Sequence, residues 1–193
     1  MSLINEDEAL IAAALNGSAY AWEKLVKRYE GKIYNQGLRL TGNASDAMDL
    51  MQEVFLGVYR NLHRFRGDAK FSSWIFRIAH NKAVDMKRRK RLMSAQPRSS
   101  DQDAGDDFDN IASEASYEPE VRLDEVQQNS QIVTMLKMLP MEQRLIVELK
   151  TFQSLTFEEI ADMQDISVNT AKTRFYTALK KLKSASEEDH VLS

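Results

Sequence analysis

The chain has 193 residues, of which 43% are hydrophobic and 28% are charged, and its formal net charge is −3. This is the composition of a globular protein, and the length allows one ordinary domain or two small ones. No cysteine is present and the three histidines are far apart, which excludes disulfides and thiolate metal sites and argues against a histidine metal cluster. No apolar run approaches the roughly 20 residues of a membrane span, and the start is acidic, unlike a signal peptide. We therefore expect a cytoplasmic protein with no membrane insertion of its own, no metal and no cofactor.

The small net charge hides blocks of opposite sign. Residues 60–91 carry eleven bases and two acids, whereas residues 98–125 carry ten acids and two bases. Residues 168–183 then carry five bases and no acid. Two basic segments on either side of an acidic one predict a chain that contacts a polyanion at two places.

Apolar residues recur at helical spacing, and with only 7 glycines and 3 prolines the sequence predicts an all-α protein. Four helices are expected in the first half: residues 6–15, a segment from Ser18 to the Gly42-Asn43 break, about 45–62, and about 72–91 with Ser72 as N-cap.

The third of these helices has two faces of different character. The face expected in the core carries Ala47, Met51, Val54, Phe55, Val58, Tyr59 and Leu62. Another face gathers Asp46, Asp49, Gln52 and Glu53, with no basic partner inside the same helix.

The first basic segment interleaves its cations with aromatic residues around Gly67, namely Phe65, Phe71, Trp74 and Phe76. Aromatic side chains stack on unpaired bases, so this mixture is typical of single-stranded nucleic-acid binding. Phe65, Trp74 and Phe76 can equally be core residues. On the helix that follows, Ile75, Ile78, Ala79 and Met86 are expected to face the core, with Arg77, Asn81 and Arg88 opposite.

Residues 94–120 are rich in Ser, Asp, Pro and Gly and have no apolar period, which predicts a flexible acidic linker. Beyond it we expect a helix over 121–139 and a second from Pro140 to about Lys150, since proline is tolerated in a first helical turn. The core positions expected on the first of these helices are Val126, Ile132, Val133, Leu136 and Leu139.

Residues 155–183 predict a helix-turn-helix. Thr156 and Glu159 form a capping box, Asp165 stands where a left-handed residue is needed, and Ser167 caps the second helix. Its expected core stripe is Val168, Ala171, Phe175, Ala178, Leu179 and Leu182, and its expected outer face is Asn169, Thr170, Lys172, Thr173, Tyr176, Lys180 and Lys183. A DNA-reading helix is favoured, and the alternative is an ordinary helical hairpin with a solvated charged face.

Two stretches resemble one protein family. The run DAMDLMQEVFLGVYRNLHRFRGDAKFSSWIFRIAHNKAVDMKRRKR, 46–91, resembles the conserved domain of bacterial RNA polymerase sigma factors of the sigma-70 family, extracytoplasmic function (ECF) group. The run LPMEQRLIVELKTFQSLTFEEIADMQDISVNTAKTRFYTALKKLK, 139–183, resembles the C-terminal domain of that group. The resemblance implies two small helical domains, at 1–93 and 121–186, with the linker at 94–120 between them and a tail at 187–193.

The resemblance also implies three sets of site residues. Positions matching the contact with the polymerase largest subunit are Asp49, Gln52, Glu53 and Phe55. Positions matching the capture of minus-10 bases and strand opening are Arg66, Lys70, Phe71, Ser73, Trp74, Arg77, Asn81, Lys87 and Arg88, with Phe65 and Trp74 expected as partial core. Positions matching the reader of the duplex minus-35 element are Thr170, Lys172, Thr173, Arg174, Tyr176 and Thr177, of which Arg174 can instead pack along the helix.

Departures from the family pattern concern promoter choice. Thr177 and Leu179 stand where the family often has Arg, which implies fewer direct contacts with the upstream element. Asp165 replaces the usual turn glycine, a change that a left-handed Asp tolerates. The resemblance further implies the partners core RNA polymerase, promoter DNA and a dedicated anti-sigma factor, which, if membrane-bound, would hold the protein at the inner membrane.

Two other classes of function remain open at this point. An autonomous helix-turn-helix regulator would bind duplex DNA without polymerase, usually as a symmetric dimer, yet no dimerisation heptad is visible. An enzyme would need a carboxylate pair such as Asp49/Glu53 or Glu158/Glu159, but no phosphate loop or metal-ligand pattern accompanies either. We expect a protein that is not an enzyme.

Overall fold

The computed structural model describes residues 3–94 and 123–191, with side chains described for 6–94 and 130–186. Every regular element in these ranges is helical, which confirms the all-α prediction. Most of the predicted linker lies outside the described residues, as does the side chain of Val126. No helix of the described part has the length and hydropathy that a membrane span requires.

The chain divides into two compact units. Unit 1 comprises Met1–Gly37 and Asn43–Glu120, and unit 2 comprises Leu38–Gly42 and Val121–Ser193.

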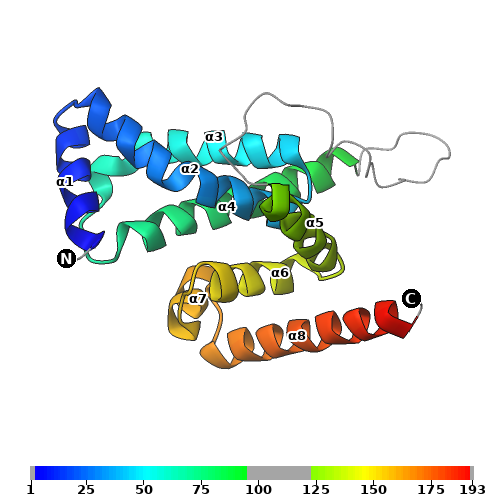
Figure 1. Ribbon diagram of the computed structural model, residues 1–193. Helices are drawn as coiled ribbons and strands as arrows, with labels where there is room; N and C mark the ends of the chain where they lie inside the picture. Colours follow the sequence, from blue (N-terminus) through cyan, green and yellow to red (C-terminus); the bar gives the residue numbers. More distant parts are fainter. Residues whose placement is uncertain (1–2, 95–122, 192–193) are drawn as a thin grey trace. The chain divides into compact units, whose positions relative to one another are not determined.

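The helices of unit 1 follow one another through short connections (Figure 1). They are α1 (Leu3–Leu15), α2 (Ala19–Thr41), α3 (Ala44–Asn61), the 3₁₀ turn η1 (Leu62–Arg64) and α4 (Phe71–Ser94). The last residues of α2, from Leu38 on, belong to unit 2. Gly42, at a φ of +74°, ends α2, and Asn43 caps α3 by accepting a 2.9 Å hydrogen bond from the Asp46 amide. The predicted break at Gly42-Asn43 is confirmed.

The core of unit 1 lies where α3 packs against α4, with α2 lying close to α3 at Gly37 and at Trp22. Its largest fully buried side chains include Leu25, Ile33, Leu50, Val54 and Ile75. Helix α2 approaches α3 closely because residue 37 is glycine. A Cβ there would lie 2.9 Å from the Ala47 Cα, a distance that real Cβ atoms do not adopt.

The charged residues of α1 fasten it to α2. Arg28 donates 2.7 Å hydrogen bonds to Asp7 and to Glu6, and the Tyr29 hydroxyl donates one of 2.5 Å to Asp7. Burial and the Asp7 carboxylate raise the pKa of Tyr29, so the hydroxyl keeps its proton and remains a donor.

Several expectations for α3 and α4 need correction. Tyr59, expected in the core, is 67% exposed, and Phe55 is only half-buried, whereas Leu50 is fully buried and was not expected to be. Helix α4 begins at Phe71, so Ser72 lies inside its first turn and is not the N-cap. Ile75 and Ala79 are buried as predicted, while Ile78 and Met86 are half-buried.

Unit 2 holds α5 (Leu123–Lys137), α6 (Met141–Val147), a π turn η3 (Glu148–Phe152), α7 (Phe157–Gln164) and α8 (Val168–Val191). Pro140, expected as the first helical residue, is the N-cap of α6, so the helix begins one position later, at Met141. The π turn replaces the regular helix expected up to Lys150. Helix α8 continues past 186 into the segment predicted as a tail.

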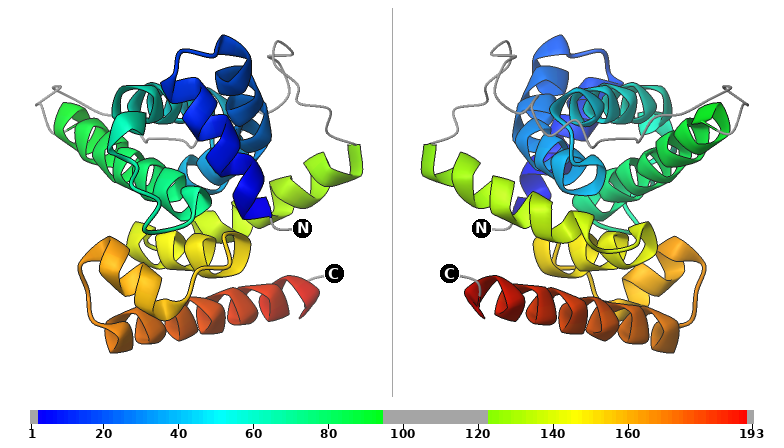
Figure 2. Two further views of the ribbon diagram at one scale, coloured as in Figure 1. Left: turned by 90° about the vertical axis from the view of Figure 1, so that its left-hand side faces the viewer. Right: turned by 90° about the vertical axis from the view of Figure 1, so that its right-hand side faces the viewer.

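Two small apolar clusters hold unit 2 together, and Phe175 of α8 packs against both. One cluster joins α6 and η3 to α7 and α8 through Ile146, Leu149, Leu155, Ile160, Ala161 and Ala171. The other consists of Leu136, Leu139, Val147 and Ala178. Figure 2 shows α6 running beside α8, with α7 at the N-terminal end of α8. Leu179, expected in the stripe, is 40% exposed.

Candidate binding surfaces

The acidic face of α3 is partly neutralised by α4. Lys82 donates a 3.0 Å hydrogen bond to Glu53, and Lys90 forms an ion pair with Asp46. The hydrogen bond and charge of Lys82 lower the pKa of Glu53. Two of the three acidic residues on this face therefore already have a partner on the neighbouring helix.

Four other exposed side chains of α3 form one stripe, which we call the α3 stripe: Asp49, Gln52, Leu56 and Tyr59. They are spaced by three or four residues, so they share one helical face. Tyr59 rests with ring centroids 5.2 Å apart against Trp22 of α2, whose ring also meets the half-buried Phe55 edge-on. The arrangement is an exposed surface with polar groups at one end and apolar groups at the other, suited to a protein partner.

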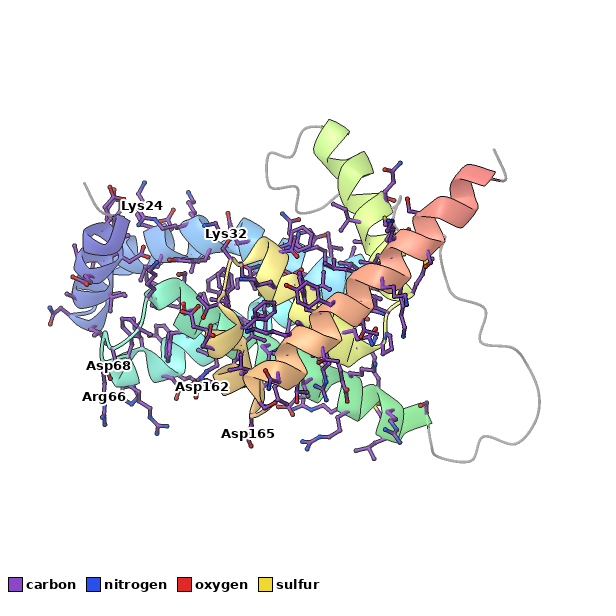
Figure 3. All side chains as sticks on the ribbon, turned by 90° about the horizontal axis from the view of Figure 1, so that it is seen from below. Lys24, Lys32, Arg66, Asp68, Asp162 and Asp165 are labelled. Atoms are coloured by element: carbon purple, nitrogen blue, oxygen red, sulfur yellow. The ribbon has the colours of Figure 1, made fainter. Side chains whose placement is uncertain are left out.

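The loop between η1 and α4 is supported by an aromatic cluster. Ring centroids of Phe65, Phe71 and Trp74 lie 5.4 to 5.7 Å apart, and Tyr29 of α2 meets Phe71 at 5.3 Å in a T-shaped contact. Gly67 reverses the loop at a φ of +77°. Figure 3 shows the side chains of Arg66 and Asp68 pointing away from the helices.

Burial sorts the predicted minus-10 residues into two groups. Phe71 is only 4% exposed and packs against the rings of Phe65 and Trp74, so in this structure its ring supports the loop from the core. Its contact with DNA stays a prediction. Trp74 and Phe65 are half-buried, as expected of partial core, and Phe76 is a buried core residue. Ser73 is half-buried, and the remaining predicted residues are exposed: Arg66, Lys70, Arg77, Asn81, Lys87 and Arg88.

One residue of α4 contrasts with its cationic neighbours. His80 is buried, and burial together with the charge of Arg77 lowers its pKa to about 4. The imidazole is therefore neutral at pH 7 and adds no charge to the basic face.

The helix-turn-helix has the predicted local geometry. The Glu159 amide donates to the Thr156 hydroxyl at 3.1 Å and the Thr156 amide donates to the Glu159 carboxylate at 2.8 Å, which confirms the capping box. Asp165 is left-handed, at a φ of +54°, and its side chain points outward from the turn (Figure 3). Ser167 caps α8 by accepting from the Thr170 amide at 3.0 Å.

The outer face of α8 presents most of the predicted minus-35 residues. Lys172, Thr173, Tyr176 and Thr177 are exposed. Thr170 is half-buried, and its hydroxyl lies 2.8 Å from that of Ser167. Arg174 is also half-buried and forms a 3.2 Å ion pair with Glu142 of α6, so its guanidinium packs along unit 2 as the alternative expectation had it.

The described residues contain no cluster of His, Cys, Asp or Glu that could hold a metal ion. The candidate surfaces therefore consist of an α3 stripe, a basic loop and helix face in unit 1, and a basic helix face in unit 2.

Two family models match the two units separately. Residues 25–92 match Sigma-70 region 2, and residues 129–182 match Sigma-70, region 4. The chain is 33% identical over 180 residues to the ECF RNA polymerase sigma-E factor of Escherichia coli K12, covering 89% of this chain and 90% of that protein. The chain is an ECF sigma factor of the sigma-70 family. As such it binds core RNA polymerase and promoter DNA in transcription initiation.

Other relatives agree with this assignment. The sigma factor is 28% identical over 182 residues to the RNA polymerase sigma-H factor of Pseudomonas aeruginosa, covering 93% of both chains. Among solved structures, CnrH in complex with the cytosolic domain of CnrY has a TM-score of 0.64 at 23% identity, covering 95% of this chain and 99% of that one. The sigma factor RpoE from Bartonella quintana, in complex with the anti-sigma factor NepR, has a TM-score of 0.64 at 16% identity, covering 86% of this chain and 96% of that one. These two structures support the fold.

Sequence reasoning missed parts of both surfaces of the sigma factor's region 2. Tyr59 was expected in the core because apolar residues on an amphipathic helix are read as core by default, and Leu56 was assigned to neither face; both are exposed. Lys82 and Lys90 were counted only as part of a basic segment, although both bind acids of α3. Lys82 and Lys90 are eight residues apart on α4, and Asp46 and Glu53 are seven residues apart on α3. From the sequence, only a comparison of these two spacings could have revealed the pairing.

Proposed function

We propose that the two units divide promoter recognition between them. Unit 1 docks on the polymerase largest subunit through the α3 stripe and Glu53, and it holds minus-10 bases with its basic loop and the outer face of α4. Unit 2 places α8 in the major groove of the minus-35 element. This assigns region 2 to residues 1–93 and region 4 to residues 121–186, joined by 94–120.

The observation that carries the proposal is the pairing of each family region with its own exposed basic surface. In unit 1 the exposed cations stand beside the half-buried Trp74 and the amide of Asn81, groups that stack on or hydrogen-bond to an unpaired base. In unit 2 the exposed hydroxyls and Lys172 stand on the second helix of a helix-turn-helix, where short polar groups reach base edges and cations reach phosphates.

The protein on this proposal performs no covalent chemistry. Unstacking a base costs a few kcal/mol, which stacking of roughly 1 to 3 kcal/mol per base and phosphate contacts can offset. Strand opening is then driven by binding energy. Phe71 has a different part in this scheme from the one its position in the family suggested, because it supports the loop from the core.

We further propose that an anti-sigma factor controls the protein. Support comes from two solved structures: RpoE is in complex with the anti-sigma factor NepR, and CnrH is in complex with the cytosolic domain of CnrY. A cytoplasmic location follows for the sigma factor itself, and a membrane-bound anti-sigma factor would hold it at the inner membrane.

Run-off transcription tests the proposal. Purified core polymerase is incubated with a pool of genomic fragments, with and without the protein. We expect discrete new start sites that require the protein and that share two upstream elements. Binding of the free protein to duplex fragments with no new starts would instead favour the autonomous regulator and would remove the unit 1 assignments.

A further inference from the structure

One aromatic side chain outside the predicted sites touches several groups of the proposed minus-35 surface. Phe157 is the first residue of α7, and its ring centroid lies 5.9 Å from Nζ of Lys172 on α8. The same ring stands 5.5 Å from that of Phe175 and 6.3 Å from that of Tyr176. A second ammonium, that of Lys150, is 4.9 Å from it.

The ring is fixed by the structure around it. The capping box at Thr156 and Glu159 holds the backbone on either side of Phe157. Lys150 also donates a 3.1 Å hydrogen bond to the carbonyl of Leu155, two residues before the ring. Phe157 is half-buried and packs against the apolar cluster that contains Ile160 and Ala171. The ring is therefore more rigid than the long exposed side chains that it meets.

The contacts of Phe157 matter because Lys172 and Tyr176 are long side chains on the exposed face of α8. They are four residues apart and thus neighbours on one helical face. A free lysine has many rotamers, and binding DNA must immobilise it at an entropic cost. An ammonium within about 6 Å of an aromatic ring is attracted to the ring face, which restricts those rotamers before DNA arrives.

We propose that Phe157 is a positioning residue for the minus-35 surface, which holds the Lys172 ammonium and the Tyr176 ring in the orientation that meets DNA. The inference rests on the proposed function of α8. It assigns a role to α7, the first helix of the helix-turn-helix. The proposed base and phosphate contacts are made by another helix, on the exposed polar face of α8. Phe157 acts through Lys172 and does not need to touch the DNA.

A double-mutant cycle on the holoenzyme tests this role. The probe is a promoter fragment obtained from the run-off experiment, and the readout is its occupancy by holoenzyme carrying wild type, Phe157→Leu, Lys172→Ala or both substitutions. We expect Phe157→Leu to weaken occupancy about 2- to 5-fold, equivalent to the 0.5 to 1 kcal/mol of an exposed cation–π contact. In the Lys172→Ala background the same substitution should have a clearly smaller effect, since the group it orients is gone.

Matched variants separate positioning from packing. Lys180 is exposed on the same helix and makes no ring contact among those described. The fold-changes in occupancy caused by Phe157→Leu and by Lys180→Ala should therefore multiply in the double variant. Phe157→Tyr keeps the ring and should restore occupancy. Should Phe157→Leu lose helicity by circular dichroism, Phe157→Met fills the site with an unbranched side chain and takes its place in the cycle.

Two results would overturn the inference. If the fold-changes in occupancy for Phe157→Leu and Lys172→Ala simply multiply in the double variant, as expected for Phe157→Leu with Lys180→Ala, Phe157 is a packing residue only. An unchanged occupancy for Lys172→Ala alone would mean that there is no contact for Phe157 to orient. Failure of the proposed function is distinct, because wild-type protein would then give no dependent start sites in the first place.

Discussion

The acidic side chains of α3, predicted together as one face, have two different roles: some bind lysines of α4, and one remains available to a partner protein. Asp49 makes no ion pair among the described residues, whereas Glu53 and Asp46 hold lysines of α4. Removing Asp49 should therefore affect a partner protein and leave the fold intact, while removing Glu53 also leaves Lys82 without its carboxylate.

For Asp49→Ala we expect an affinity for core polymerase reduced by about 5- to 10-fold, the roughly 1 to 1.4 kcal/mol of one hydrogen bond at an exposed surface. The melting temperature should stay within about a degree. Direct titration of labelled core polymerase measures the affinity. Glu23→Ala serves as the control, since Glu23 is an exposed carboxylate of the same unit paired only with Lys27. Equal affinities for all three proteins would remove Asp49 from the docking surface.

His80 gives a residue-scale prediction about pH. Its pKa is about 4 in the folded protein and about 6.5 when unfolded, so the unfolded chain binds more protons between these values. The stability that its burial contributes is present above pH 6.5 and is lost as the pH falls toward 4. Between pH 7.5 and 5.0 the loss is about 2 kcal/mol of unfolding free energy.

Urea unfolding at the two pH values, for wild type and His80→Gln, measures this loss. Carboxylates titrate in both proteins, so the difference between the two pH dependences isolates His80. Wild type should lose about 2 kcal/mol more than the variant on acidification. Identical pH dependences would show that the imidazole becomes protonated without unfolding the region around it.

At the scale of helices, the sequence predicted best where local chemistry decides the structure. The Thr156/Glu159 capping box, the left-handed Asp165 and the Ser167 cap all depend on residues within three positions of each other, and all are present. It failed where tertiary packing decides. The start of α4 is set by burial of Phe71 among Tyr29, Phe65 and Trp74, so the nearby Ser72 is not used as a cap.

The same reason explains the errors on α3 and α8. Whether Leu50 or Tyr59 faces the core depends on where α2 and α4 lie, which periodicity along one helix does not specify. Leu179 is exposed because the buried stripe of α8 narrows to Ala178 at that turn.

Thr156→Ala tests the contribution of the capping box to the C-terminal unit. We expect a loss of about 1 kcal/mol in unfolding free energy, because the Glu159 amide in the first turn of α7 loses its acceptor, the Thr156 hydroxyl. Thr151→Ala, at an exposed threonine of η3 outside the capping box, should change the value by less than about 0.5 kcal/mol. Urea unfolding followed by circular dichroism compares the two. A similar loss in both variants would mean that the hydroxyl at 156 is not what stabilises α7.

For the whole molecule, the distribution of charge matters more than its sum. Two basic surfaces share a chain with ten acids at 98–125, so the free protein carries its own competitor for polyanions. This predicts weak binding to DNA by the protein alone, at a strength that depends on those acids.

Neutralising part of this segment is a direct test. Five substitutions to Asn, at Asp101, Asp103, Asp106, Asp107 and Asp109, should raise the affinity of the free protein for non-promoter duplex severalfold at 50 mM salt. The difference should shrink at 300 mM salt, because exposed charges are then screened over a shorter distance. Fluorescence anisotropy of a labelled duplex measures both. A difference that persists at high salt would point to a cause other than charge.

The ion pair between Glu53 and Lys82 has a consequence for the order of events at a promoter. If polymerase binds Glu53 as proposed, a cation of polymerase replaces Lys82 as the partner of this carboxylate. The Lys82 ammonium is then released on α4, the helix proposed to hold the opened strand. Docking then makes α4 more attractive to phosphate, and by reciprocity a strand bound at Lys82 strengthens the hold on polymerase. On this proposal the Glu53–Lys82 salt bridge couples polymerase binding to DNA binding, so that each of the two interactions strengthens the other.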